Sequence, residues 1–325
     1  MARVGVIGGG AFGTAMACVA RRSLHEVVLW AREPEVVAGL NDDRVNQMFL
    51  PDVRVSPGIR ATSDLREAVG DAEFVLMVAP AQHVREVALQ LESLLDAGTP
   101  VIACSKGIER HSHALMPRVL RETLPGARIA VLSGPSFARD IAADLPAGVT
   151  LAAEDYALAR SLAGKIGNPR FRVEPSSDLT GTALGGVMKN VIAIASGIAA
   201  GKKLGESARA TLITLGLGET VKLGLALGAQ RETFDGFAGV GDLMLTANSL
   251  QSRNTSLGFA LGEGRRLADI LAARKEVTEG VHSAESIAAL AQRLDVQMPI
   301  SRIVDQILNR GADVDALVER AIAGG

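Results

Sequence analysis

The first half of the chain alternates short apolar runs with longer amphipathic runs. The apolar runs predict seven strands, namely RVGVIG from Arg3, EVVLW from Glu26, EFVLMVA from Glu73, PVIAC from Pro100, RIAVLS from Arg128, AGVTLAA from Ala147 and FRVEP from Phe171. Between them lie the helix-like runs AFGTAMACVARR, AQHVREVALQLESLL and EDYALARSLAGKI, and in the second Val84, Val87 and Leu91 share one helical face. This alternation predicts a Rossmann-like α/β domain with a parallel sheet covered by helices.

The pattern of apolar and polar residues changes after about Asp178. Strand-like runs disappear, and long runs rich in Ala, Gly and Leu predict helices almost to the end. We expect turns near Gly201, Gly239 and Gly262, and a further helix that opens at Pro299. The sequence therefore predicts two domains, an α/β domain at residues 1–178 and an all-α domain at residues 179–325.

One helical run, from Gly181 to Gly201, is long enough to span a bilayer. Lys189 and Asn190 lie at its centre, however, where a charge in a membrane is costly. The composition of this run therefore favours a buried core helix over a membrane span.

Composition excludes several classes of protein. The 325 residues are 48% hydrophobic and 22% charged, which is typical of a globular protein. The net charge is −2 and the basic residues are scattered, so neither a nucleic-acid interface nor a polybasic membrane patch is expected. Cys18 and Cys104 lie in small apolar runs and are predicted to be free thiols, as is usual in the cytoplasm.

A glycine-rich turn follows the first predicted strand. Gly8, Gly10 and Gly13 form a G-x-G-x-x-G pattern at the start of a helix, with Ala11 within it. In a Rossmann unit the first glycine permits the turn, the second admits the pyrophosphate and the third allows close packing of helix and strand. The strand-to-helix context favours a dinucleotide site over a merely flexible turn.

The residue that follows the second strand selects between the two nicotinamide dinucleotides. An acidic side chain there favours NAD, whereas Arg accommodates the 2′-phosphate of NADP. The run LWARE places Arg32 at this point with Glu33 beside it. Arg32 favours NADP, and NAD stays open as the alternative.

Lys189 is the strongest candidate for the chemistry. The five histidines lack partners with metal-ligand spacing, and no serine-nucleophile motif occurs. Lys189 is the one charged residue between Asp178 and Lys202, so it needs a buried partner or a shifted pKa. Either condition suits a proton donor during hydride transfer, and Asn190 could orient it. The alternative is a lysine that extends to the surface.

Three further segments carry candidate ligand-binding groups. Lys106 and the SGPSFA run, from Ser133 to Ala138, follow the carboxyl ends of predicted strands, where ligands bind in open sheets. The run GVGDLMLT places Asp242 in what we expect to be a tight glycine turn.

The run QSRN places Ser252, Arg253 and Asn254 at the start of a helix. Free N–H groups, the helix dipole and an Arg in the first turn together make a natural phosphate site. The alternative is that Ser252 is an ordinary N-cap and Arg253 is solvated.

Taken together, the motifs resemble those of NAD(P)-dependent glycerol-3-phosphate dehydrogenases. They occur in family order as GGGAFGTA, VVLWAR, FLPDV, CSKGI, SGPSFA, GGVMKNVIAI, GVGDLMLT, QSRN, TEG and QMPI. The resemblance implies reversible hydride transfer between dihydroxyacetone phosphate and sn-glycerol 3-phosphate, for phospholipid synthesis. It also implies a C-terminal domain like that of 6-phosphogluconate dehydrogenase, and a homodimer.

The resemblance also implies roles for individual residues. Lys189 matches the catalytic lysine, with Lys106 and Asp242 beside it in the catalytic set. The substrate contacts implied are Lys106, Gly134, Ser136, Lys189, Asp242, Ser252, Arg253 and Asn254. The cofactor contacts implied, besides the glycine turn, are Phe12, Arg32, Lys106, Ala138, Arg253, Val277 and Glu279.

Two other classes of function would require different sequence features. A different helical-domain dehydrogenase, such as a 3-hydroxyacid or ketopantoate reductase, would need another substrate set in place of Arg253 and Asn254. A redox-sensing regulator would carry a DNA-binding or basic element and would not require Lys189. Neither feature is evident in the sequence.

Overall fold

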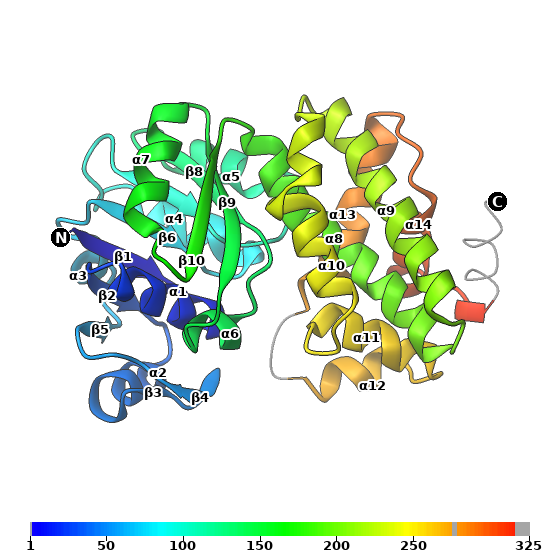
Figure 1. The fold of residues 1–325 in the computed structure, drawn as a ribbon, viewed down its shortest axis with the longest axis horizontal. Coiled ribbons are helices and arrows are strands. Elements are labelled where there is room, and N and C mark those ends of the chain that lie inside the picture. Colours follow the sequence, from blue (N-terminus) through cyan, green and yellow to red (C-terminus); the bar gives the residue numbers. More distant parts are fainter. Residues whose placement is uncertain (1, 275–277, 316–325) are drawn as a thin grey trace. The chain divides into compact units, whose positions relative to one another are not determined.

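The computed structural model describes residues 2–274 and 278–315 (Figure 1). Contacts divide the chain into two compact units: Met1–Ser105 with Met116–Leu179, and Lys106–Leu115 with Thr180–Gly325. The segment Lys106–Leu115, which the sequence analysis assigned to the first domain, joins the second unit because Ile108 is fully buried in that unit's core.

The first unit is built on one eight-stranded sheet. Its strands, in sheet order, are β10 (Phe171–Ser176), β9 (Ala147–Ala153), β8 (Arg128–Ser133), β7 (Pro100–Ala103), β6 (Phe74–Met77), β1 (Arg3–Ile7), β2 (Glu26–Trp30) and β5 (Ile59–Thr62). The seven predicted strands are confirmed. The predicted parallel sheet is confirmed except at one pair, because β8 and β9 run antiparallel. All the other neighbouring pairs are parallel.

The edge strand β5 was not predicted, and a side chain closes part of its open edge. Asn41 Nδ2 donates to the Ala61 carbonyl at 2.9 Å, and Asn41 Oδ1 accepts from the Ala61 N–H at 2.9 Å. The amide thus imitates a neighbouring strand. Such covering protects an edge from pairing with another chain.

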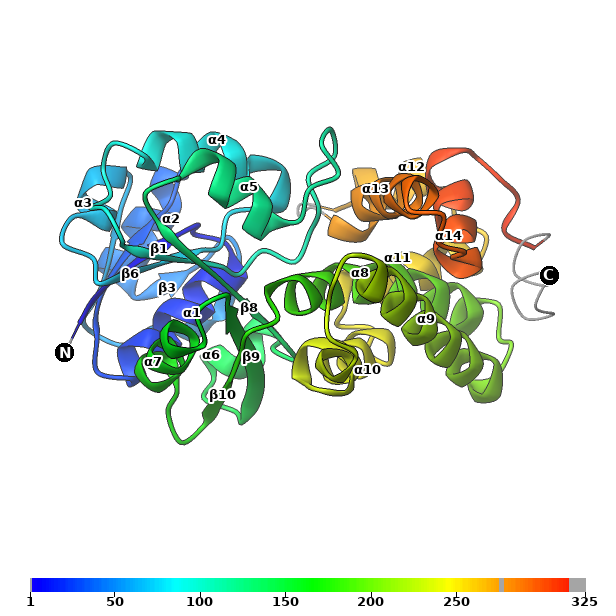
Figure 2. The ribbon, with the colours of Figure 1, turned by 90° about the horizontal axis from the view of Figure 1, so that it is seen from above.

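Helices cover both faces of this sheet (Figure 2). Helices α3, α4 and α5 lie on one face, and α1, α6 and α7 lie on the other. The elements that join the strands are α1 (Ala11–Arg22), α2 (Pro34–Ala38), η1 (Gly39–Asp43), the hairpin β3 (Val45–Asn46) and β4 (Leu50–Arg54), α3 (Leu65–Val69), η2 (Ala81–His83), α4 (Val84–Leu91), α5 (Met116–Thr123), α6 (Ala138–Ala142) and α7 (Tyr156–Ile166). This arrangement confirms the predicted Rossmann-like domain.

The second unit is helical, as predicted, and no described residue after Leu179 forms a strand. Its elements are α8 (Leu179–Gly201), α9 (Glu206–Ala226), η3 (Arg231–Asp235), η4 (Phe237–Gly241), α10 (Asp242–Ala247), α11 (Arg253–Gly262), α12 (Leu267–Ala272), α13 (Glu279–Arg293) and α14 (Pro299–Asn309). Pro299 opens α14 as expected, and Gly201 and Gly262 end helices. Gly239 does not form a turn but lies in the π-helical segment η4.

Helix α8 is the core of this unit. Its length and composition would allow it to cross a membrane. However, 83% of its most apolar 18-residue stretch is buried inside the protein, as is usual for a core helix. Helix α11 packs closely against it through glycines. A Cβ on Gly197 would lie 2.2 Å from the Thr255 carbonyl oxygen, and one on Gly258 would lie 2.1 Å from that of Ile194. This close approach brings the start of α11 beside the middle of α8.

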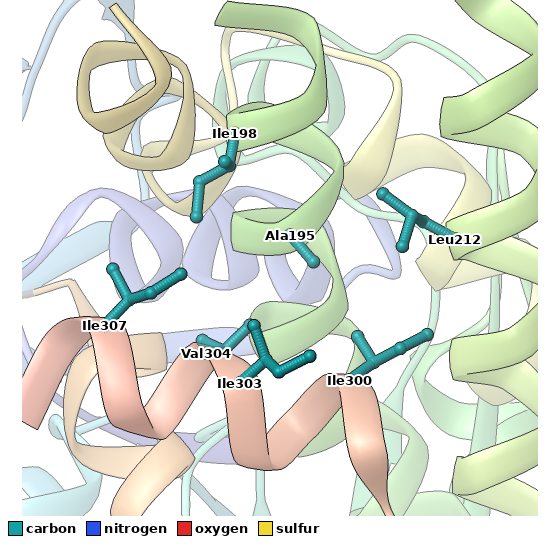
Figure 3. A pocket seen from close by; sticks show the side chains of 7 residues that line it. All are labelled: Ala195, Ile198, Leu212, Ile300, Ile303, Val304 and Ile307. Carbon is teal, nitrogen blue, oxygen red and sulfur yellow. The ribbon is translucent and has the colours of Figure 1, made fainter. Parts of the chain in front are cut away.

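A small apolar cavity of about 20 Å³ remains in the core of the second unit (Figure 3). Figure 3 shows that side chains of α8, α9 and α14 face it. The lining residues are Ala195, Ile198, Leu212, Ile300, Ile303, Val304 and Ile307. A space this small and apolar is a local packing defect rather than a ligand site.

Candidate active site

The glycine turn of the first unit has the geometry that a dinucleotide requires. A Cβ on Gly13 would lie 1.8 Å from the Gly8 carbonyl oxygen, so a side chain at Gly13 would collide with the turn itself. A Cβ on Gly10 would meet nothing within 4 Å, so the backbone here faces open space. Helix α1 begins directly after, and no side chain caps its first turn. The residues therefore fit a pyrophosphate held by the N-terminus of α1.

The pair that follows β2 joins two opposite charges. Arg32 Nη2 and Nε lie 2.9 and 3.2 Å from Glu33 Oε1. The side chain of Arg32 is 75% exposed and that of Glu33 is 25% exposed. A positive and a negative group therefore lie directly after β2, and either nicotinamide dinucleotide is chemically possible beside them.

The SGPSFA segment turns sharply after β8. Gly134 has φ +150°, and a Cβ there would lie 2.7 Å from Val149 Cα, so the position requires glycine. The Ser136 hydroxyl donates to the Gly134 carbonyl at 2.9 Å, and Ala138 begins α6. Gly134, Ser136 and Ala138, the candidate ligand-binding residues of this segment, therefore lie on one turn of the first unit.

In the second unit, the three residues proposed as catalytic meet in one buried group, here called the charged cluster: Lys106, Lys189 and Asp242. Asp242 Oδ2 lies 2.7 Å from Lys106 Nζ, and Oδ1 lies 2.8 Å from Lys189 Nζ. The side chains are 14%, 11% and 1% exposed for Lys106, Lys189 and Asp242. One carboxylate therefore bridges two ammonium groups, which leaves the charged cluster with a net positive charge.

Burial and charge set the protonation behaviour of the charged cluster. Burial lowers the pKa of Lys189 to about 8; Lys106 and Arg253 lower it too, whereas Asp242 raises it. Burial alone would raise the pKa of Asp242, but the neighbouring Lys106 and Lys189 outweigh it and hold that pKa below its usual range. Asp242 therefore stays ionised, and Lys189 is poised to exchange a proton near neutral pH.

Asp242 reaches this position from an unexpected element. The sequence predicted a tight glycine turn, but Asp242 is the first residue of α10 and directly follows the π-helical segment η4. The chain stays helical here because the glycines of GVG lie in a π-helical turn that leads directly into α10. The next turn of α10 then carries Thr246 beside Asp242.

Thr246 is a member of the site that the sequence analysis missed. Lys189 Nζ donates to Thr246 Oγ1 at 2.9 Å, and that hydroxyl donates to Asp242 Oδ1 at 3.4 Å. Its spacing of four residues from Asp242 in GDLMLT could have indicated a shared helical face. Thr246 fixes the direction of the Lys189 ammonium.

A chain of amide hydrogen bonds ties the charged cluster to neighbouring helices. Asn190 Nδ2 donates to the Lys106 carbonyl at 2.9 Å, and Asn254 Nδ2 donates to Asn190 Oδ1 at 2.9 Å. The Gly280 N–H then donates to Asn254 Oδ1 at 3.1 Å. Asn190 therefore holds the loop that carries Lys106.

The start of α11 combines a cap with a cation. Ser252 is the N-cap, and its hydroxyl accepts from the Thr255 N–H at 3.2 Å. Arg253 is exposed at the first helical position, and its carbonyl accepts from Arg274 at 2.6 Å. This arrangement suits both a phosphate site and the plainer alternative of an ordinary cap with a solvated arginine.

The remaining candidates lie outside the charged cluster. Glu279 is the first residue of α13, and Val277 lies outside the described residues. Cys18 and Cys104 are buried free thiols, as predicted. Among residues 2–274 and 278–315, no group of His, Cys, Asp and Glu side chains could hold a metal ion.

Comparison with known proteins covers nearly the whole chain. Residues 3–159 match the family model for the NAD-dependent glycerol-3-phosphate dehydrogenase N-terminus, and residues 178–319 match the model for its C-terminus. A glycerol-3-phosphate dehydrogenase, NAD(P)+, of Parvibaculum lavamentivorans is 51% identical over 316 residues, which is 97% of this chain and 95% of that one. One of Caulobacter vibrioides is 51% identical over 322 residues, 99% and 96% of the two chains.

Solved structures agree with the sequence comparison. A crystal structure of glycerol-3-phosphate dehydrogenase from Coxiella burnetii has a TM-score of 0.94 and 35% identity, covering 98% of each chain. A ketopantoate reductase from Ralstonia eutropha has a TM-score of 0.60 and 17% identity over 98% of this chain and 99% of that one, so it shares the fold alone. The chain therefore belongs to the NAD-dependent glycerol-3-phosphate dehydrogenase family of NAD(P)-dependent oxidoreductases.

Proposed function

We propose that the chain interconverts dihydroxyacetone phosphate and sn-glycerol 3-phosphate, with Lys189 as the group that gives and takes the proton at the substrate oxygen. The observation that carries this assignment is the hydrogen-bonded group of Lys189, Asp242 and Thr246 inside a buried site. The bound dinucleotide supplies the hydride. In the reducing direction the Lys189 ammonium protonates the oxygen on which negative charge develops, and in reverse the neutral amine accepts that proton.

Asp242 and Lys106 support the chemistry electrostatically. Asp242 stays ionised and offsets part of the positive charge, so that two ammonium groups can be buried together. Lys106 leaves a net positive charge that favours an oxyanion and an anionic substrate. The proposal therefore gives Asp242 a positioning and charge-balancing role, and Lys106 a role in holding the substrate.

We assign the phosphate of the substrate to the start of α11. Ser252, Arg253 and Asn254 combine a capped helix N-terminus with an exposed guanidinium. Gly134 and Ser136 are proposed as further substrate contacts. For the dinucleotide we propose Gly8, Gly10, Ala11, Phe12, Gly13, Arg32, Lys106, Ala138, Arg253 and Glu279, together with Val277.

The cellular setting is likewise proposed. We expect a homodimer in the cytoplasm, with buried free thiols suited to a reducing compartment, and a product used in phospholipid synthesis. The domain boundary after residue 178 stays a prediction.

The test follows oxidation of NADPH and of NADH with dihydroxyacetone phosphate in the wild type and in Lys189→Met. The variant keeps the side-chain length but has no proton to give, so kcat should fall about 10³-fold. Lys222→Met, on the exposed face of α9, is the matched control and should keep wild-type turnover. Equal turnover in a folded Lys189→Met protein would overturn the assignment of Lys189. No turnover in the folded wild type would overturn the reaction.

A further inference from the structure

We propose that Thr255 is a positioning residue: its hydroxyl holds the end of α10 and thereby keeps Thr246 in contact with Lys189. Thr255 lies in the first turn of α11 and acts through the backbone of Thr246 rather than on the substrate. The inference rests on the proposed function in taking Lys189 as the group that exchanges the proton.

Helix α10 is too short to fix its own geometry. It has six residues, which is less than about two turns. A helix of this length is not stable in isolation, so contacts with other elements decide where it lies. Asp242 occupies its first turn and Thr246 the next, and both side chains contact Lys189. The geometry around Lys189 therefore depends on what holds the ends of α10.

Side chains of neighbouring helices hold its carboxyl end. The last carbonyl groups of a helix have no partner inside the helix. Thr255 Oγ1 donates to the Thr246 carbonyl at 2.6 Å. Ser196 Oγ of α8 donates to the Ala247 carbonyl at 2.9 Å, and Arg209 Nη2 of α9 lies 3.3 Å from the same oxygen. Among these contacts, the one from Thr255 reaches Thr246 itself, whose side chain belongs to the site.

The hydrogen bond from Thr255 is buried. Thr255 is 1% exposed and Thr246 is 2% exposed, so bulk water does not reach this bond. A buried carbonyl that loses its donor is unfavourable, and the end of α10 would shift toward another donor. Thr255 is itself fixed, because its N–H donates to Ser252 Oγ at 3.2 Å. Thr255 therefore ties Thr246 to the capped start of α11.

A shift of Thr246 would change the proton affinity of Lys189. The Thr246 hydroxyl accepts from Lys189 Nζ at 2.9 Å, and a hydrogen bond to an ammonium favours its charged form. Loss of this contact would lower the pKa of Lys189 further. A change at Thr255 removes no charge from the site. The charges that act on Lys189 are those of Asp242, Lys106 and Arg253.

The test compares three variants with the wild type in the reduction of dihydroxyacetone phosphate by NADPH. Thr255→Val keeps the shape of the side chain and removes the hydroxyl, whereas Thr255→Ser keeps the hydroxyl and removes the methyl group. Thr220→Val is the matched control, because Thr220 is also buried but its hydroxyl donates to the Gly216 carbonyl of its own helix at 2.9 Å.

In Thr255→Val, kcat should fall about tenfold, because Lys189 is displaced from its reacting position. The KM for dihydroxyacetone phosphate should change less than about twofold, since the valine keeps the N–H that donates to Ser252. The pH at which kcat/KM has fallen by half should move down by about half a unit. Thr255→Ser and Thr220→Val should keep the wild-type kcat and pH midpoint.

Three results would overturn the inference. The first is a wild-type kcat and pH midpoint in a folded Thr255→Val protein. The second is a lower kcat with an unchanged midpoint, which a merely structural role would give. The third is an equal loss in Thr255→Ser, which would assign the effect to packing. Thr255→Ala also removes the hydroxyl, should show the same kinetic changes, and replaces the valine variant if that one does not fold.

Amide hydrogen exchange in α10 tests the inference without substrate. Exchange should be about tenfold faster in Thr255→Val than in Thr255→Ser, and equal rates would overturn the inference. Failure of the proposed function would look different. In that case the wild type would not reduce dihydroxyacetone phosphate, or its pH midpoint would persist in Lys189→Met, while exchange in α10 would still differ between the two Thr255 variants.

Discussion

The glycine turn of the first unit and the charged cluster of the second depend on different physical interactions. At the turn, a side chain on Gly8 or Gly13 would collide with backbone atoms at 2.9 or 1.8 Å, whereas one on Gly10 would enter the open space in front of the backbone. In the charged cluster, side chains from separate helices and a loop meet through charges that are nearly sealed from water. The turn should therefore be sensitive to any added atom, whereas the cluster should be sensitive to any removed charge.

The largest expected effect on stability comes from removing the central carboxylate of the charged cluster. Asp242→Asn leaves two buried ammonium groups facing a neutral amide, so the free energy of unfolding should fall by about 3–5 kcal/mol. Denaturant unfolding near neutral pH measures this. Asp269→Asn, in an exposed pair with Arg266, is the control and should leave stability unchanged. A stability of Asp242→Asn equal to that of the control would show that the cluster is not held by its charges.

A second prediction separates binding from folding at the glycine turn. Gly13→Ala places its methyl group against the Gly8 carbonyl and should lower the free energy of unfolding by about 1–3 kcal/mol. Gly10→Ala meets open space, so stability should stay within about 0.5 kcal/mol of the wild type. The Gly10 variant should nevertheless lose at least about tenfold in NADPH affinity, because the methyl group occupies the approach of the pyrophosphate.

Unfolding without ligand, and calorimetry with NADPH, measure the two quantities separately. If Gly10→Ala bound NADPH as tightly as the wild type, the pyrophosphate would not approach the backbone at Gly10.

The smallest expected effect concerns the small apolar cavity in the core of the second unit. Val304→Ile adds one carbon facing the cavity of about 20 Å³ (Figure 3). Filling such a space should raise the free energy of unfolding by about 0.5 kcal/mol, given about 24 cal/mol per Å³ of cavity. Turnover should not change, since no member of the charged cluster lines the cavity. Destabilisation would show that the cavity cannot accept a methyl group.

The same contrast explains what the sequence could predict. The glycine turn is local, so its strand, its helix and the seven strand-like runs were predictable from consecutive residues. The antiparallel β9 was not, because the direction of a strand leaves no trace in its apolar pattern. The edge strand β5 was missed because IRAT has only four residues and pairs with a strand on one side alone, the side chain of Asn41 covering its other edge.

The charged cluster was predictable only in part. Lys189 was found because a charge in an apolar helix needs a partner. Its contact with Asp242 and the contact of Asp242 with Lys106, 136 residues away in the chain, have no local pattern. Their grouping came from the family resemblance, which the comparisons confirm. Thr246 was missed because a lone hydroxyl in a helix is common.

The pH dependence of kcat/KM in the two directions tests the central claim, that Lys189 carries the proton, most directly. Its pKa is lowered to about 8, mainly by burial. Reduction needs the ammonium, so its kcat/KM should fall as the pH rises through about 8. Oxidation needs the neutral amine, so its kcat/KM should rise up to about pH 8 and then level off. Working above about pH 7 avoids titration of the substrate phosphate.

We expect these opposite profiles in the wild type and neither of them in the residual activity of Lys189→Met. Profiles that bend the same way in both directions, or that persist in Lys189→Met, would show that Lys189 does not carry the proton.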